Sequence, residues 1–137
     1  MKRFLFCWLA LLPLLGACVG LVDQGPGVDE STYHFTEAMR WRDYAAAARF
    51  VEPQAQPEFS ACFPRDDEDL RIVESRLETL NVKEDQQSAE ADYVLEYYRL
   101  PSSRVKKWRW TQHWRLRREK PDKPGVWLIV NAPPPLP

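Results

Sequence analysis

The sequence predicts a single α+β domain in which two N-terminal helices pack on a four-stranded antiparallel sheet. Apolar residues recur at helical spacing over residues 31–51, and apolar and polar residues alternate strictly from residue 88 onwards. The chain has 137 residues, which is too short for two domains of ordinary size. Because a helical segment precedes a run of strands, the helices are expected to cover the apolar face of the sheet.

The helical segment divides into two parts. One apolar stripe begins at Phe35 and a second begins at Tyr44, and the two stripes differ in phase. Asp43 is a good N-cap for a helix that begins at Tyr44, so we expect two helices joined by a tight turn. One bent helix is the alternative, because a further set of apolar residues aligns along the whole segment: Ala38, Trp41, Ala45 and Ala48.

Residues 52–69 are predicted to form a loop, because they contain three prolines and end in an acidic run. A short helical turn is expected at 58–63, with no segment long enough for a third helix. The first strand is then expected over 70–83. Its apolar face would contain Val73, Leu77 and Thr79.

The next two strands, over 88–100 and 106–116, carry the clearest pattern. The first alternates small apolar and aromatic residues with acids, and the second alternates tryptophans with bases. If Ser102 and Ser103 form a two-residue hairpin loop, apolar residues face one another and acids face bases. The expected pairs are Tyr97 with Trp108, Leu95 with Trp110, Ala91 with Trp114, Glu96 with Arg109, Asp92 with His113 and Glu90 with Arg115. A short fourth strand is expected over 126–131, after a turn at 121–125.

The N-terminus has the layout of a secretory signal, with two basic residues before an apolar run. The run is about a dozen residues long, well short of the roughly 20 that span a bilayer. The four residues that end in Cys18, Leu-Gly-Ala-Cys, resemble the bacterial lipobox. The resemblance implies a signal peptide over 1–17 and fatty acids such as palmitate on Cys18. Val19 stands where an inner-membrane retention signal would place Asp, so it also implies the periplasmic face of the outer membrane.

The mature chain is then expected to have three parts. A lipid-anchored tether over 18–30 is followed by the α+β domain over 31–131 and a proline-rich tail over 132–137. The tail can adopt a polyproline II conformation and dock in an aromatic groove, or it can simply end the chain. Cys62 is left without a cysteine partner, and its position between Ala61 and Phe63 is typical of a small buried apolar residue.

Two phrases, AMRWRDYAAAARFV and YYRLPSSRVKKWRWTQHW, together with the order of the elements and Trp127, resemble small bacterial lipoproteins of the NTF2-like and cystatin-like superfamily. The resemblance covers residues 32–130 and implies a curved sheet wrapped around a helix. The short segment between residues 51 and 69 departs from the full-length fold, and this argues against a deep pocket. Members of this superfamily include isomerases, hydratases, transport factors and lipoproteins without known activity, so the resemblance does not decide function.

Composition argues against several function classes. Nineteen Lys and Arg residues against 20 Asp and Glu residues give no bulk attraction to nucleic acid. Two histidines and one unpaired cysteine match no metal-ligand spacing, and five glycines contain no phosphate-binding motif. We therefore expect no nucleic-acid partner, no metal and no cofactor.

Catalysis is not expected either, because the strand acids and His113 point away from the apolar face of the sheet. The remaining candidates for an acid, base or hydrogen-bond donor are His34, Asp43, Tyr93 and Tyr97. Asp43 is better explained as a helix cap, His34 as a surface residue, and neither tyrosine is a competent base near neutral pH. An isomerase-like or hydratase-like enzyme remains the third alternative.

Two kinds of binding site are predicted instead. The leading one is a basic surface that contacts anionic lipid or an acidic envelope protein, formed by residues without acidic partners: Arg104, Lys106, Arg117, Arg118 and Lys120. The alternative is a shallow pocket for a small apolar ligand, formed by aromatic residues that otherwise fill the core: Trp41, Tyr93, Tyr97, Trp108, Trp110 and Trp114. The leading hypothesis is thus a non-catalytic, lipid-anchored protein that binds or supports another envelope component.

Overall fold

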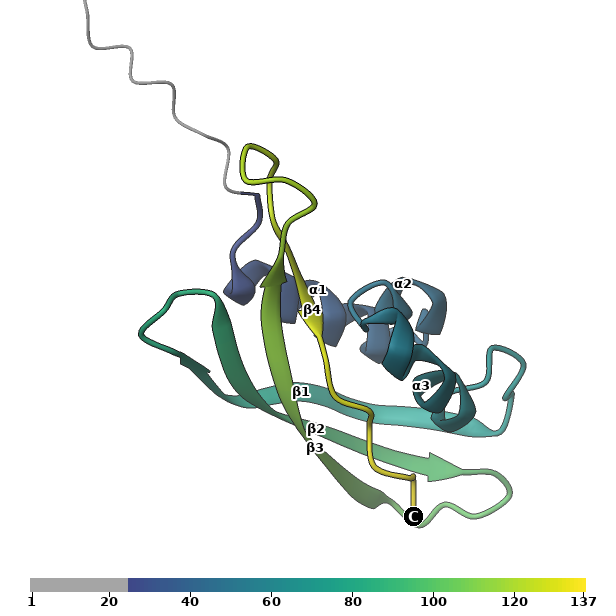
Figure 1. Ribbon diagram of the computed structural model, residues 1–137. Helices are drawn as coiled ribbons and strands as arrows, with labels where there is room; N and C mark the ends of the chain where they lie inside the picture. Colours follow the sequence, from purple (N-terminus) through teal and green to yellow (C-terminus); the bar gives the residue numbers. More distant parts are fainter. Residues whose placement is uncertain (1–24) are drawn as a thin grey trace, which may run out of the picture.

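The computed structural model describes residues 25–137 of the chain (Figure 1). The predicted signal peptide over 1–17, the predicted lipidation site Cys18 and the first part of the predicted tether lie outside these residues. No helix within residues 25–137 is long and apolar enough to cross a membrane.

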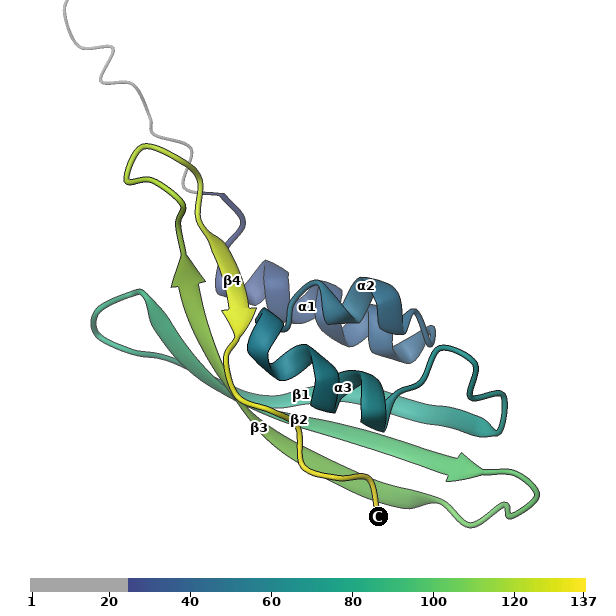
Figure 2. The ribbon, with the colours of Figure 1, turned by 45° about the vertical axis from the view of Figure 1, so that its right-hand side comes forward.

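The described chain is an α+β domain with helices first and strands after them, as predicted. The four strands form one antiparallel sheet in the order β1-β2-β3-β4. The sheet bends, and the helices lie together inside the bend (Figures 1 and 2). The elements are α1 (Val28–Arg40), α2 (Tyr44–Ala48), the 3-10 helix η1 (Pro53–Ala55), α3 (Gln56–Cys62), β1 (Leu70–Val82), β2 (Ser88–Arg99), β3 (Lys106–Arg117) and β4 (Val126–Ile129).

The turn between α1 and α2 has the predicted form. The Asp43 carboxylate accepts a hydrogen bond from the Ala46 backbone N–H at 2.9 Å, so Asp43 caps α2. However, α1 begins at Val28, three residues before the predicted start of the domain. Asp29 and Glu30 lie in its first turn, where carboxylates complement the helix dipole, and Val28 is buried. The predicted tether over 18–30 was therefore too long.

The predicted loop over 52–69 was wrong in part, because it contains η1 and the third helix, α3. The prolines do not break these helices, since each helix has a proline in its first turn. A proline there removes an N–H that has no intrahelical partner in any case. Phe59 and Phe63 are each 1% exposed, so this segment contributes to the core.

The pairing of β2 with β3 differs from the predicted register by two residues. Tyr97 pairs with Lys106, Leu95 with Trp108, Tyr93 with Trp110 and Ala89 with Trp114; Glu96 pairs with Lys107, Asp92 with Thr111 and Glu90 with His113. A shift by two preserves the face of every side chain, so the predicted inner and outer faces are correct. The predicted two-residue loop is wrong: β2 ends at Arg99, and residues 100–105 form the connection. Pro101 has no N–H to donate to a longer ladder.

Strand β1 departs from simple alternation at two places. Its register with β2 shifts between Ile72 and Glu74 and again between Leu77 and Thr79. Each bulge moves the following side chains to the opposite face. Leu77 packs against the core as predicted. The predictions for Val73 and Thr79 were wrong, because Val73 is 53% exposed and Thr79 hydrogen bonds to Asp92 on the outer face.

The core lies between the helices and the inner face of the sheet. Phe35 of α1 is its centre, with ring centroids 5.3 Å from Tyr93 and 6.1 Å from both Trp110 and Trp114. A buried polar contact joins the same elements: the Ser75 hydroxyl lies 2.7 Å from the Tyr93 hydroxyl and donates to the Thr36 carbonyl at 2.8 Å. The helices are thus fixed on the sheet by both ring packing and hydrogen bonds.

Candidate functional site

The aromatic residues predicted to line a pocket do not come together as one site. Five of them are between 0% and 3% exposed and fill the core: Tyr93, Tyr97, Trp108, Trp110 and Trp114. Trp41 does not join them, since it follows the end of α1 and is 75% exposed. The part of the prediction that placed Trp41 in a pocket was therefore wrong. Tyr93, Trp110 and Trp114 all pack their rings against Phe35, which leaves these three little surface for a ligand.

The predicted basic surface is divided between the two ends of β3. Arg104 and Lys106 lie at its start, and Arg117 lies at its end, followed by Arg118 and Lys120. At about 3.4 Å per residue, the two groups are separated by about 37 Å. Arg117 also has an acidic partner, contrary to the prediction, because its guanidinium lies 2.8 Å from the Glu52 carboxylate. The five bases therefore do not form a single surface.

The surface is nevertheless indented at the end of β3. Arg118 lines three clefts there, of about 510, 360 and 420 Å³. The first lies against the β1–β2 turn, the second against Gly25 and the start of α1, and the third against the β3–β4 connection. Lys123 lines the third cleft and was missed as a candidate, because the sequence window that suggested a basic surface ended at Lys120.

The described chain also begins at this end. A β-carbon on Gly25 would lie 2.6 Å from the carbonyl oxygen of Gly125 in the β3–β4 connection, so the two backbones are in contact. Gly25 has a φ of 75°, which favours glycine. Figure 1 shows the β3–β4 connection beside the point at which the described chain begins. Gly25, in the predicted tether, thus lies next to Arg118, with which it lines the second cleft.

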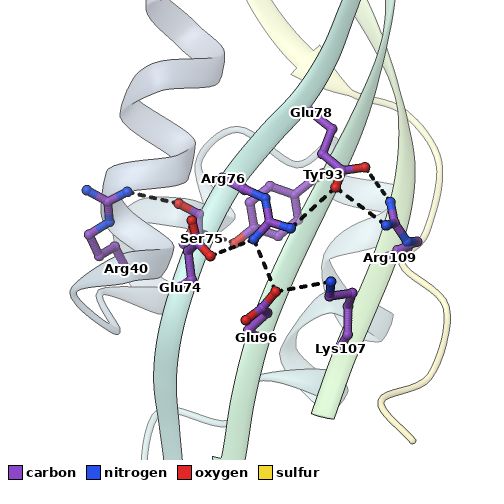
Figure 3. A network of polar contacts seen from close by, with 9 residues as sticks. All are labelled: Arg40, Glu74, Ser75, Arg76, Glu78, Tyr93, Glu96, Lys107 and Arg109. Atoms are coloured by element: carbon purple, nitrogen blue, oxygen red, sulfur yellow. Dashed lines mark hydrogen bonds and ion pairs between the residues drawn. The ribbon is translucent and has the colours of Figure 1, made fainter. Parts of the chain in front are cut away.

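The outer face of the sheet carries an extended network of ion pairs (Figure 3). Arg76 is at its centre and contacts Glu74 at 2.6 Å, Glu96 at 3.2 Å and Glu78 at 3.3 Å. Lys107 adds a second contact to Glu96 at 3.2 Å, and Arg109 pairs with Glu78. Bases on β1 and β3 thus meet acids on β1 and β2 across this face.

The predicted acid–base ladder lies on this face, but its partners are different. Glu96 pairs with Lys107 rather than Arg109, and Glu90 lies 3.9 Å from His113 rather than beside Arg115. Asp92 accepts hydrogen bonds from two threonine hydroxyls, Thr79 at 2.8 Å and Thr111 at 2.9 Å. These hydrogen bonds lower the pKa of Asp92, and the hydrogen bonds from Lys107 and Arg76 lower the pKa of Glu96. The contacts follow from the register described above.

Each residue considered for catalysis has a separate structural partner. The His34 imidazole lies 3.7 Å from the Glu30 carboxylate on the surface of α1, and Asp43 caps α2. Tyr93 is buried against Ser75, and burial raises the pKa of its hydroxyl. Tyr97 donates its hydroxyl to the carbonyl of Pro137 at 2.7 Å. These four contacts involve four different parts of the molecule.

The C-terminal tail over 132–137 is docked on the domain. It follows Asn131, whose side-chain amide donates to the Thr111 carbonyl at 2.8 Å and accepts from the His113 N–H at 2.7 Å. These are the two bonds that a neighbouring parallel strand would make to the edge of β3. Asn131 therefore replaces one step of a strand ladder, and it was not singled out from the sequence because nothing local indicates this role.

We expect Asn131→Ala to lower the free energy of unfolding by about 1–3 kcal/mol, because two backbone groups of β3 lose their partner. Asn131→Asp keeps the acceptor for the His113 N–H but places a carboxylate oxygen against the Thr111 carbonyl oxygen, so it should not recover the lost stability. Urea denaturation of the three proteins checks this order. Equal stability of the wild type and Asn131→Ala would show that the amide does not hold the edge of β3.

No family model, no curated protein and no solved structure matches this chain. Within residues 25–137, no group of three or more His, Cys, Asp or Glu side chains is placed to hold a metal ion. The function is therefore inferred from the chain's own residues.

Proposed function

We propose that this protein is a non-catalytic, lipid-anchored envelope protein that binds or supports another envelope component. Its location would be the periplasmic face of a bacterial outer membrane, with the anchor on Cys18. An NTF2-like or cystatin-like fold is part of the proposal, and the helices packed inside the bend of a four-stranded sheet support it. The observation that carries the proposal is that the chain enters the domain beside a group of bases that have no ion-pair partner among the described residues.

The length of the tether supports a fixed orientation. A fully extended chain spans at most about 3.6 Å per residue, so Cys18 lies within about 25 Å of Gly25. Gly25 in turn contacts the β3–β4 connection. A lipid on Cys18 would therefore keep this end of the domain close to the headgroups and direct the β2–β3 end away from the membrane.

After Arg117, the β3–β4 connection at the membrane-proximal end has three bases, Arg118, Lys120 and Lys123, against two acids, Glu119 and Asp122. Arg118, Lys120 and Lys123 are exposed and have no ion-pair partner among residues 25–137. A base near an anionic membrane contributes about 1 kcal/mol of attraction. This end carries part of the basic surface predicted from the sequence. Arg104 and Lys106 lie at the opposite end of β3, where they can contact only a component away from the membrane.

The experiment is complementation of a deletion strain with variants at matched abundance. Reversing two membrane-proximal charges, with Arg118→Glu and Lys120→Glu together, should weaken the phenotype because attraction to phosphate becomes repulsion. The matched control reverses two exposed bases that lie outside the predicted basic surface, Arg49→Glu with Arg65→Glu.

Three further variants test the non-catalytic part of the proposal: His34→Ala, Asp43→Asn and Tyr93→Phe. Each should complement as well as the wild type provided that the domain folds, since none of these side chains is assigned to chemistry. A loss confined to His34→Ala or Asp43→Asn, with the charge-reversed variant fully active, would favour an enzyme over a binding protein.

A further inference from the structure

The tail over 132–137 lies in a groove between α3 and β3, which we call the tail groove. Its walls are formed by Cys62 at the end of α3, by Trp108 and Lys106 on β3, and by Tyr97 on β2. Figure 2 shows the C-terminal residues leaving β4 and running along this side of the sheet. We propose that the tail groove is a recognition site for proline-rich segments of other polypeptides and that the chain's own tail occupies it in cis.

The tail has the properties of a preorganised ligand. It reads Ala-Pro-Pro-Pro-Leu-Pro, so each residue is either a proline or precedes one. Proline fixes φ near −65°, and the residue before a proline is excluded from the helical region. The segment is thus extended before it docks, and docking costs little conformational entropy.

The hydrogen bonds of the tail groove match such a ligand. None of the four prolines has an N–H, so the segment offers carbonyl acceptors almost alone. The tail groove offers donors: the Trp108 indole N–H lies 3.2 Å from the Pro134 carbonyl, and the Tyr97 hydroxyl lies 2.7 Å from the Pro137 carbonyl. Lys106 adds its ammonium group, 3.2 Å from the Pro137 carbonyl.

The spacing of the contacts is that of a polyproline II helix, which has three residues per turn. Pro133 is buried and Leu136 is half-buried against the core, three residues later. The carbonyls that accept the hydrogen bonds belong to Pro134 and Pro137, also three residues apart. Pro135 lies between the anchors and is exposed. The tail groove therefore recognises one face of the helix, with an apolar anchor and an acceptor in each turn.

The ligand that fits is a proline-rich segment whose two apolar anchors, a proline and a leucine, are three residues apart. The residue after each anchor supplies the oxygen that accepts a hydrogen bond from the tail groove. The hydrogen bonds of Asn131 to β3 do not involve the six residues after it, so the tail can leave without breaking them. A tethered tail competes at an effective concentration in the millimolar range, so it excludes weak ligands. This inference rests on the proposed binding role of the domain and is independent of the anchor at Cys18 and of the bases at the other end of β3.

The test uses the chain truncated after Asn131 and a synthetic peptide of residues 132–137, with binding followed by calorimetry. The truncated chain should bind the peptide, and the full-length chain should bind it at least tenfold more weakly because the tail competes. Trp108→Phe in the truncated chain keeps an aromatic ring at this position and loses the indole donor, so it should weaken binding several-fold.

Two altered peptides provide a matched control for the register. A peptide in which the buried anchors Pro133 and Leu136 are both alanine should bind at least tenfold more weakly. A peptide in which only the exposed Pro135 is alanine should bind within about threefold of the original. Failure of the folded, truncated chain to bind the peptide, or equal binding of all three peptides, would overturn the proposal.

If the truncated chain does not fold, the full-length variant with Pro133→Ala and Leu136→Ala replaces it, since its own tail has lost both anchors. This variant should then bind the peptide, and the wild type should bind it at least tenfold more weakly. Because fatty-acid labelling and complementation report on the anchor and the basic end, a failure here is distinguishable from a failure of the proposed function.

Discussion

Trp114→Ala should lower the free energy of unfolding by about 3–5 kcal/mol, because it removes a large side chain from a closed core. Trp114 is 0% exposed and packs its ring 6.1 Å from Phe35 and 6.3 Å from Phe50. Its indole N–H donates to the Gln112 side chain at 3.0 Å, so the change also leaves a buried amide oxygen without its donor. Urea denaturation followed by far-ultraviolet circular dichroism measures the loss.

The control is Arg109→Gln on the opposite face of the same strand. Arg109 is 58% exposed and pairs with Glu78 across the outer face. Exposed ion pairs contribute little to stability, so this variant should unfold at nearly the wild-type urea concentration. A larger loss for Arg109→Gln than for Trp114→Ala would mean that the inner and outer faces of the sheet are exchanged.

The sequence predicted the faces of β2 and β3 correctly but not their register. Alternation has a period of two, so it excludes a slip of one residue and does not distinguish registers that differ by two. The predicted alignment had more direct acid–base pairs than the observed one. In the structure the charged residues have other ion-pair partners: Arg109 pairs with Glu78 on β1, and Arg76 on β1 pairs with Glu96 on β2. The observed register includes ion pairs with a third strand, β1, which the patterns of β2 and β3 alone do not reveal.

Strand β1 was harder to predict for a related reason. Its two bulges each interrupt the alternation, and a pattern read without them assigned Val73 and Thr79 to the wrong face. The N-cap at Asp43 was predictable because capping depends on residues only a few positions apart. The helix cap was therefore predicted correctly from local residues, whereas the register and the bulges, which depend on neighbouring strands, were not.

The candidate surfaces show the same distinction. Residues 104–120 form one basic window in the sequence, yet an extended strand separates its two ends across the length of the sheet. The ion pair of Arg117 with Glu52 joins residues 65 positions apart, and the docking of the tail on Trp108 joins residues 26 positions apart. Neither contact leaves a local signal. The proline-rich composition of the tail did indicate a segment able to dock in an aromatic groove.

Cys18→Ser should abolish membrane attachment, because the thiol is the only nucleophile that the lipobox resemblance assigns to the acyl chains. Acylation contributes about 0.8 kcal/mol per buried CH₂, so two or more chains make attachment effectively permanent and their loss releases the protein. Fractionation of cells that express each protein should place the wild type in the membrane fraction and the variant in the soluble fraction. Cys62→Ser is the matched control and should remain in the membrane fraction, since Cys62 is half-buried beside the tail.

The most direct test of a lipid-anchored domain is metabolic labelling with a radioactive fatty acid, combined with the intact mass of the purified protein. We expect the wild type to carry the label on a chain that begins at Cys18, and Cys18→Ser to carry none. An unlabelled wild type, or a labelled Cys18→Ser variant, would contradict the proposed anchor and with it the orientation of the β3–β4 end towards the membrane.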